Sequence, residues 1–133
     1  MKKKYTGIDL FCGIGGFRLA MKSNNVKCVF SSDNDKFAQQ TYEANFHEIP
    51  TGDIKAVEAK DIPHFDILTA GFPCQPFSYA GEKQGFNDEV RGTLFFDVCR
   101  ILEYHKPPMV FLENVKGLKS QGKTLQTVLD SLK

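Results

Sequence analysis

The chain has 133 residues, of which 41% are hydrophobic, and its formal net charge is +1 at pH 7. This length predicts one soluble globular domain, and the near-neutral charge argues against the chain being, by itself, the main surface that grips nucleic acid or a membrane. The 4 cysteines lack CxxC spacing and nearby histidine pairs, so we expect no metal site. Neither a signal peptide nor a membrane-length apolar run is visible, so we expect no membrane contact. A cytosolic protein with reduced thiols is the natural expectation.

Apolar runs and helical patterns alternate along the chain. We predict strands at residues 5–12, 27–31, 65–70 and 108–113, helices at 17–24, 35–46, 93–105 and 121–132, and a turn at 51–54. This alternation implies βαβ units and a parallel sheet with right-handed crossovers. Residues 71–92 lack regular periodicity, and because this long loop begins at a candidate nucleophile we interpret it as an active-site flap.

A glycine turn follows the first strand, in the stretch Asp9-Leu-Phe-Cys-Gly-Ile-Gly-Gly16. Ligands of open parallel sheets bind at the carboxyl ends of the strands, where glycines let the backbone approach a ligand and supply positive φ. The spacing is not GxGxxG, so it supports a pyrophosphate cradle only weakly. The alternative is that the glycines merely make a tight turn and that Asp33 caps the following helix.

Two further acids fit a nucleoside-containing cofactor. Asp33 follows the second strand and suits a ribose, because one carboxylate can accept from both vicinal hydroxyls. Asp53 can accept from an exocyclic amine, with Phe11 and Ile54 giving apolar cover to a purine ring. Residues of this kind in this order favour the cofactor over the simple turn.

A cysteine and a glutamate follow the last two strands. They are Cys74, in Gly71-Phe-Pro-Cys-Gln-Pro-Phe-Ser78, and Glu113, in Glu113-Asn-Val115. A thiolate that adds to C6 of cytosine makes C5 nucleophilic, and an acid that burial keeps protonated eases the addition by acting at N3. The alternative is that the cysteine is an apolar filler and the glutamate an exposed acid. We assign Cys28 and Cys99 to such filling, expect Cys12 to pack rather than react, and interpret His47, His64 and His105 as structural or surface residues.

Taken together, these stretches resemble the amino-terminal half of a DNA cytosine-5 methyltransferase. The pieces that match, in the order of the family, are Asp9 to Phe17, Asp33, Gly52-Asp53-Ile54, Gly71 to Ser78, Arg91-Gly-Thr-Leu-Phe95 and Glu113-Asn-Val115. The Pro-Cys-Gln and Glu-Asn-Val pieces are highly specific, whereas the glycine turn alone is not.

The resemblance implies an α/β chain with the three-layer, Rossmann-like fold of S-adenosylmethionine-dependent methyltransferases, with a mostly parallel sheet that is incomplete on its C-terminal side. Residues 1–133 would be the N-terminal part of the catalytic domain. The implied reaction transfers a methyl group from S-adenosylmethionine to C5 of a cytosine flipped out of duplex DNA, through a covalent Cys–C6 intermediate. The implied setting is cytoplasmic, of bacterial or phage type, nucleoid-associated and part of a restriction-modification system, and no metal is implied.

The resemblance also assigns roles to residues. Cys74 is the nucleophile and Glu113 acts at N3, while Phe11 packs on the adenine, Asp33 holds the ribose hydroxyls and Asp53 takes the adenine amine. The full set expected at the cofactor is Asp9, Phe11, Gly13, Gly15, Asp33, Asn34, Asp53, Ile54, Pro73 and Leu94. The residues expected at the DNA, in or beside the flap, are Gln75, Ser78, Lys83 and Arg91.

The chain departs from the family pattern in 3 residues and in length. Cys12 stands where the family often has alanine. Asn34 stands where many members have a large apolar residue that lies against the adenine, and Asp33 stands where glutamate is more common. The arginine motif that holds the cytosine, the target-recognition domain and the last helix of the cofactor pocket are not found. We therefore expect little turnover from this chain alone, as a fragment, a truncated product, or one subunit of a split enzyme whose second polypeptide supplies those parts.

Two alternatives to an enzyme of this kind stay open. One is a non-catalytic module, derived from a methyltransferase, that binds a cofactor or a partner. The other, a nucleotide-dependent oxidoreductase, is disfavoured because the glycine spacing differs and Cys74 would have no role.

Overall fold

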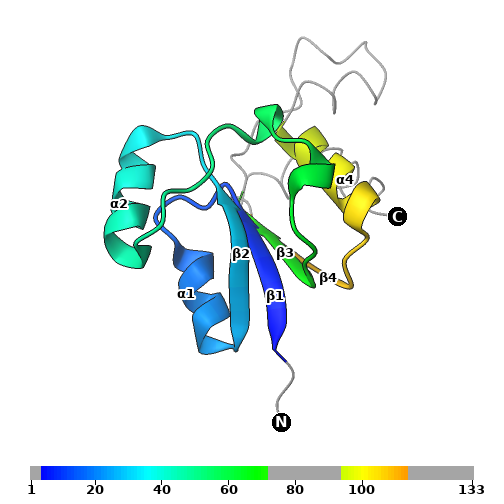
Figure 1. Cartoon of the computed structure of the whole chain (residues 1–133), viewed down its shortest axis with the longest axis horizontal. Coiled ribbons are helices and arrows are strands. Elements are labelled where there is room, and N and C mark those ends of the chain that lie inside the picture. The colour runs from blue at the N-terminus through cyan, green and yellow to red at the C-terminus, as the bar shows by residue number, and fades with distance from the viewer. Residues whose placement is uncertain (1–3, 72–93, 114–133) are drawn as a thin grey trace, which may run out of the picture.

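The computed structural model describes residues 4–71 and 94–113 (Figure 1). Within them, four parallel strands form one sheet in the order β2-β1-β3-β4. The strands are β1 (Tyr5–Leu10), β2 (Val26–Ser32), β3 (Ile67–Ala70) and β4 (Met109–Leu112). The helices are α1 (Gly16–Ser23), α2 (Lys36–Phe46) and α4 (Leu94–His105), with short 3-10 helices η1 (Ile54–Ala56) and η2 (Ala59–Asp61).

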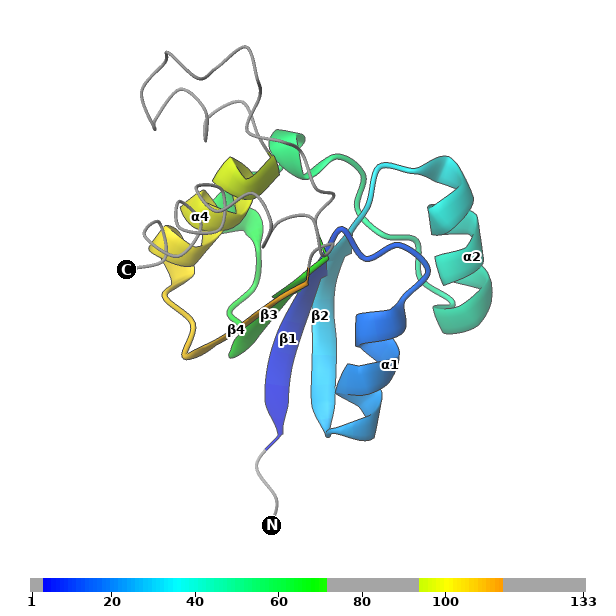
Figure 2. The same cartoon turned by 180° about the vertical axis from the view of Figure 1, so that it is seen from behind.

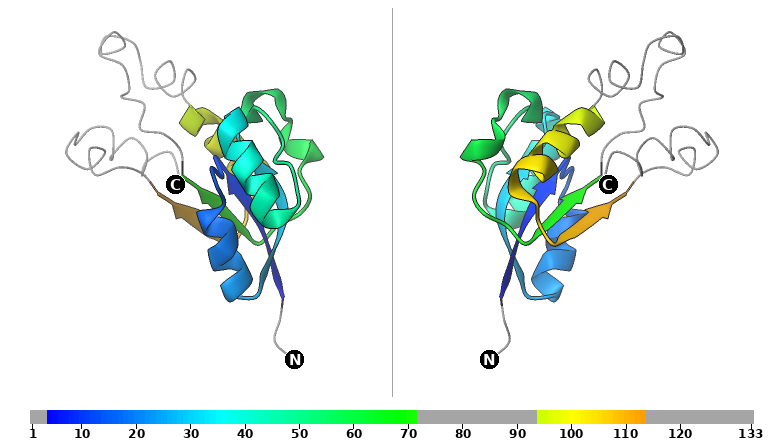
Figure 3. Two further views of the ribbon diagram at one scale, coloured as in Figure 1. Left: turned by 90° about the vertical axis from the view of Figure 1, so that its left-hand side faces the viewer. Right: turned by 90° about the vertical axis from the view of Figure 1, so that its right-hand side faces the viewer.

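Helices lie on both faces of this sheet, which makes three layers (Figure 3). Side chains alternate along β1, so Ile8 and Leu10 point into the core that α4 covers, whereas Gly7 and Asp9 point to the opposite face. A Cβ added at Gly7 would lie 3.1 Å from Met21 Cε of α1, which places α1 on that opposite face. The helices α1 and α2 lie toward the β2 side of the sheet and α4 toward the β3–β4 side (Figure 2).

The main core lies between the sheet and α4. It consists of buried side chains from β1, β3, η1, α4 and the segment before β3, namely Ile8, Leu10, Ile54, Ile62, Phe65, Leu68, Ala70, Phe95, Val98 and Ile101. A partly buried ion pair reinforces the helix side, because Arg100 donates to Asp97 Oδ1 at 2.9 Å and to the Ile54 carbonyl at 2.7 Å. The core thus fixes η1 and α4 against one face of the sheet.

The predicted parallel α/β order is confirmed, and element boundaries differ by a few residues. The third strand begins at Ile67 rather than at residue 65. Phe65 is fully buried but packs against the ring of His105, with a centroid distance of 4.8 Å. The Asp66 carboxylate accepts a hydrogen bond from the Thr6 N–H at 2.9 Å. The predicted helix at 121–132 and nearly all of the predicted flap lie outside the described residues.

None of the helices within residues 4–71 and 94–113 is long and apolar enough to cross a bilayer.

Replacing Leu68 by alanine tests the core. Leu68 is fully buried at the centre of the sheet, so Leu68→Ala should lower the free energy of unfolding by about 2–5 kcal/mol in urea titration. Leu19→Ala is the matched control, because Leu19 on α1 is 58% exposed and its truncation should cost well under 1 kcal/mol. Equal losses in the two variants would contradict this core.

Candidate active site

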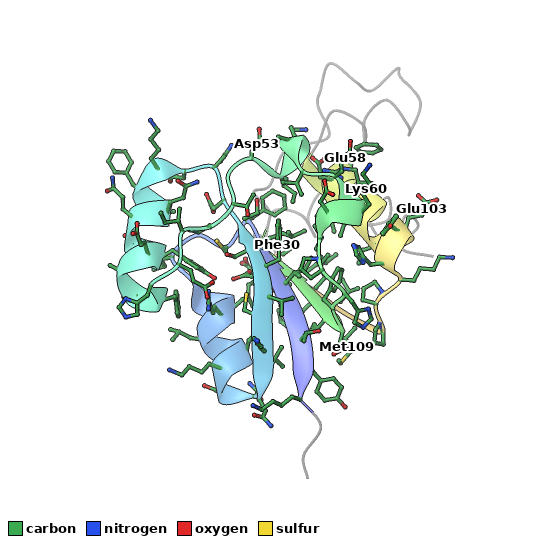
Figure 4. All side chains as sticks on the ribbon, in the orientation of Figure 1. Phe30, Asp53, Glu58, Lys60, Glu103 and Met109 are labelled. Atoms are coloured by element: carbon green, nitrogen blue, oxygen red, sulfur yellow. The ribbon has the colours of Figure 1, made fainter. Side chains whose placement is uncertain are left out.

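The parallel register brings the carboxyl ends of the strands to one edge. Leu10 pairs with Ser32 and with Ala70, and Ala70 pairs in turn with Leu112. The residues that follow these strands therefore lie side by side. Figure 4 shows Asp53 at this end of the sheet and Met109, the first residue of β4, at the opposite end.

Glu113 lies at this edge, directly beside the end of β3. Its backbone N–H donates to the Ala70 carbonyl at 2.9 Å, and a Cβ added at Gly71 would lie 3.0 Å from its Oε2. The carboxylate thus lies over the strand end that leads, three residues later, to Cys74. Glu113 is exposed, so the burial required for the predicted role at N3 is not supplied by the described residues.

Several predicted site residues cannot be placed at this edge. Cys74, Pro73, Gln75, Ser78, Lys83 and Arg91 all lie outside the described residues. Leu94 is the first residue of α4. The roles of these residues therefore stay predictions.

The glycine turn has the backbone conformation that its sequence predicts. Gly13 has φ +56° and Gly15 has φ +99°, both in the left-handed region that glycine enters without strain. Phe11 also lies there, with φ +54°, at a cost of about 1–2 kcal/mol for a residue with a side chain. Nothing in the sequence signals this conformation of Phe11. A strained residue held next to a glycine turn is typical of functional sites.

Asp33 binds the glycine turn instead of capping a helix. Its Oδ2 accepts from the Gly13 N–H at 2.8 Å and its Oδ1 accepts from the Asp35 N–H at 2.8 Å. The N-cap of α2 is Asp35, which accepts from the Phe37 N–H, so the capping alternative for Asp33 is wrong. An ionised carboxylate has about four acceptor positions, so Asp33 can still accept from two ligand hydroxyls.

Asp9 is fully buried on the α1 face of the sheet, next to the turn. Its Oδ1 accepts from Thr69 Oγ1 at 3.0 Å, and its Oδ2 has no hydrogen-bond partner among the described residues. Burial raises the pKa of Asp9 to about 7, although the hydrogen bond from Thr69 and the charge of Arg18 act in the opposite direction. A buried acid with one unsatisfied oxygen is suited to receive a cationic or donor group.

The remaining cofactor candidates differ in exposure. Asp53 is exposed and accepts from the Lys55 N–H at 2.9 Å, so it caps η1 while keeping one oxygen for a ligand. Asn34 is exposed. Ile54 is only 3% exposed and packs in the core, so it leaves little surface for contact with a ligand.

The other described cysteines are protected thiols. Burial raises the pKa of Cys12 and of Cys28, and burial together with the charge of Glu103 raises the pKa of Cys99 to about 11. All three thiols are therefore protonated at neutral pH, which agrees with the prediction that they pack rather than react. Among the residues that the structure describes, no group of three or more His, Cys, Asp or Glu side chains could hold a metal ion.

The three histidines lie at structural or surface positions, and the exposed His64 ring lies 3.7 Å from Asp66 Oδ1. The His105 ring contacts the Ala59 carbonyl at 2.8 Å, His64 is 83% exposed, and His47 ends α2. These positions agree with the structural or surface roles predicted from the sequence.

Comparison with known proteins gives a consistent family. Residues 5–133 match the family model described as C-5 cytosine-specific DNA methylase. The chain is 58% identical to type II methyltransferase M.HpaII of Haemophilus parainfluenzae over 137 residues, which cover 100% of the chain and 38% of that protein. It is 53% identical to type II methyltransferase M.HhaI of Haemophilus parahaemolyticus over 135 residues, covering 98% of the chain and 41% of the relative. The chain thus spans about two fifths of the length of these relatives.

Solved structures agree on the fold. A DNMT2 mutant of Spodoptera frugiperda superposes with a TM-score of 0.75 at 26% identity, covering 97% of this chain and 40% of that one. The Dnmt2 methyltransferase of S. pombe gives a TM-score of 0.73 at 23% identity over 96% of this chain and 41% of that one, which speaks for the fold alone. The predicted Rossmann-like methyltransferase fold is confirmed.

The buried acid gives a prediction about pH. Between pH 3.8, the ordinary pKa, and about 7, folded Asp9 keeps a proton that the unfolded chain releases, so the free energy of unfolding should fall as pH rises through this window. Asp9→Asn keeps an acceptor for Thr69 and removes the charge. The variant should lose this slope and become more stable than the wild type above pH 7, by at most about 4 kcal/mol. Parallel urea titrations from pH 4 to 8 measure both, and an unchanged slope would contradict a buried Asp9.

Gly15 and Gly16 give a matched pair of variants. A Cβ at Gly15 would lie 2.1 Å from Phe46 Cε2 in a residue with φ +99°, whereas no described atom lies within 4 Å of a Cβ at Gly16. Gly15→Ala should therefore lower the free energy of unfolding by roughly 2–4 kcal/mol, from strain and overpacking together. Gly16→Ala should be neutral or slightly stabilising, because Gly16 begins α1. Urea titration distinguishes the two, and a harmless Gly15→Ala would refute this turn geometry.

Proposed function

This chain belongs to the C-5 cytosine-specific DNA methylase family, and from that premise we propose that it is the cofactor-binding and catalytic half of a DNA cytosine-5 methyltransferase. The proposed reaction transfers a methyl group from S-adenosylmethionine to C5 of cytosine in duplex DNA. The observation that carries the proposal is the close approach of Glu113 to Gly71, which puts an acid over the strand end that leads to Cys74.

The proposed chemistry uses two residues of this edge. The Cys74 thiolate adds to C6 of a flipped cytosine, and Glu113 donates to N3 as electron density moves through the ring to C5. Bound S-adenosylmethionine supplies the methyl group on an electrophilic sulfonium. C5 would take this methyl group with S-adenosylhomocysteine as the leaving group, and Glu113 would regain its proton from N3. Loss of the C5 proton to a base then breaks the bond between C6 and sulfur and returns the free thiolate, so atoms and charge balance over the cycle.

The residues around the glycine turn fit the proposed cofactor. Among the described residues, nothing lies within 4 Å of a Cβ added at Gly13, so they leave space for a ligand against the backbone there. Asp33, fixed at 2.8 Å from the Gly13 N–H, keeps acceptor positions for the ribose hydroxyls, and Asp53 keeps one for the adenine amine. The unsatisfied Oδ2 of Asp9 is suited to the ammonium group of the cofactor's methionine part. Phe11 would pack on the adenine.

We also propose that the missing parts come from further polypeptide, on a second chain or in a longer protein. Support comes from β4, an edge strand with apolar side chains exposed on both faces. Met109 is 38% and Phe111 55% exposed on the α1 face, and Val110 is 41% exposed on the α4 face. Such a strand is typical of the interior of a larger sheet. The near-neutral charge of the chain agrees with a DNA-gripping surface located mostly in those parts. The setting we propose is the cytoplasm, at the nucleoid.

Trapping on modified DNA tests the proposed reaction. With S-adenosylmethionine and the complementing polypeptide present, duplex DNA containing 5-fluorocytosine should give a covalent adduct that survives denaturing electrophoresis, because fluorine at C5 cannot leave as a proton does. Cys74→Ser should abolish the adduct. Cys28→Ser is the matched control and should keep it, since Cys28 is half-buried in β2.

Two other results would count against the enzyme. An adduct that persists in Cys74→Ser would remove this cysteine from its proposed role. If neither the wild type nor a variant forms an adduct, but the wild type binds S-adenosylmethionine in a titration, a non-catalytic module would be favoured instead.

A further inference from the structure

The end of α2 packs directly against the glycine turn. Phe46, the last residue of α2, lies so close to Gly15 that an added Cβ would be 2.1 Å from one ring carbon and 2.8 Å from the next. Asp33, just before α2, bonds the Gly13 N–H at 2.8 Å. The turn is therefore in contact with both ends of the α2 segment, through a hydrogen bond at one end and a ring at the other.

Arg18 holds the Phe46 ring in this place. Its guanidinium lies 5.1 Å from the Phe46 centroid and 5.5 Å from that of Tyr42, which are cation–π distances. It also donates to Glu48 through both terminal nitrogens, at 2.8 and 3.1 Å, and to the Tyr42 hydroxyl at 3.1 Å. Arg18 lies in the first turn of α1, so these contacts join the start of α1 to the end of α2.

Glu48 is the acid that forms a direct ion pair with Arg18, whereas buried Asp9 interacts with Arg18 through its charge. Arg18, Phe46 and Glu48 line a cavity of about 560 Å³, whose other charged lining residues among those described are Lys4, Lys22 and Lys27, all basic. The Arg18 side chain is 17% exposed, so neutralising Glu48 would leave a largely buried guanidinium among other cations. The pair with Glu48 is therefore what fixes Arg18 over the ring.

We propose that Arg18, Phe46 and Glu48 form a positioning clamp, which holds the glycine turn in its ligand-binding conformation through Gly15. None of the three is expected to touch the cofactor, so they act on affinity only through the turn. The inference rests on the proposed function, because the ligand whose affinity it sets is the proposed S-adenosylmethionine.

The test compares two acids near the same helix in the complete chain. Glu48→Gln breaks the bidentate pair, whereas Glu43→Gln removes an exposed acid within α2 and is the matched control. Amide NMR without ligand reports the turn directly through Gly13 and Gly15, and titration with S-adenosylmethionine gives its dissociation constant. We expect Glu48→Gln and Phe46→Leu to shift both amide signals and weaken binding roughly three- to ten-fold. Arg18→Lys, which keeps the charge but loses the planar fork, should fall in between, and Glu43→Gln should match the wild type.

The possible outcomes distinguish failure of the proposed clamp from failure of the proposed function on which it rests. If Glu48→Gln lowers the melting temperature but leaves the Gly13 and Gly15 amides and the dissociation constant unchanged, the three residues are merely structural and the inference is overturned. If the wild-type chain binds no S-adenosylmethionine, the proposed function fails, and the amide shifts alone then decide whether the clamp positions the turn.

Discussion

The parallel register of the sheet is the constraint on which the rest of this structure depends. Because Leu10, Ser32, Ala70 and Leu112 end their strands side by side, every segment that follows a strand begins at the same edge. The register is fixed by burial, since a slip of one residue would exchange Ile8 and Leu10 for Gly7 and Asp9 in the core that α4 covers. A chemical site made from four distant pieces of sequence therefore follows from packing at the centre of the domain.

On the proposed function, the glycine turn is the part of this edge that meets the ligand. Two glycines and Phe11 adopt positive φ there. The turn is fixed from outside by the hydrogen bond from the Gly13 N–H to Asp33 and by the close approach of the Phe46 ring to Gly15. A turn held in this way pays its ordering entropy on folding rather than on binding, which preserves ligand affinity. The same arrangement leaves Asp9 buried with an unsatisfied oxygen, a cost in stability that a bound ligand with a donor group would offset.

Much of this could be predicted from the sequence, because apolar periodicity and the motif residues are local signals. They gave the parallel α/β order, the family and the glycines that need positive φ. The capping alternative for Asp33 was wrong because Asp35, two residues later, competes for the same helix start and is better placed to accept from Phe37. The burial of Ile54 and the clamp around Arg18 depend on tertiary contacts between segments about 30 or more residues apart, as in the pair of Arg18 with Glu48, and no local pattern encodes them.

The exposed side chains at the β4 edge indicate which site residues this chain supports by itself and which need further polypeptide. The proposed cofactor-side residues Asp9 and Asp33 have their supporting contacts inside this chain, whereas Glu113 lies exposed beside β4. There Val110 is 41% exposed, and Phe111 stays 55% exposed although its ring contacts that of Phe17. An acid that must stay protonated to act at N3 needs a drier environment than this edge provides by itself. On the proposed function, the same further polypeptide that covers Val110 and Phe111 would therefore also desolvate Glu113. Completion of the sheet and activation of the acid would then be a single event, so on this proposal the present half would hold the cofactor-side contacts but would need the remaining polypeptide for catalysis.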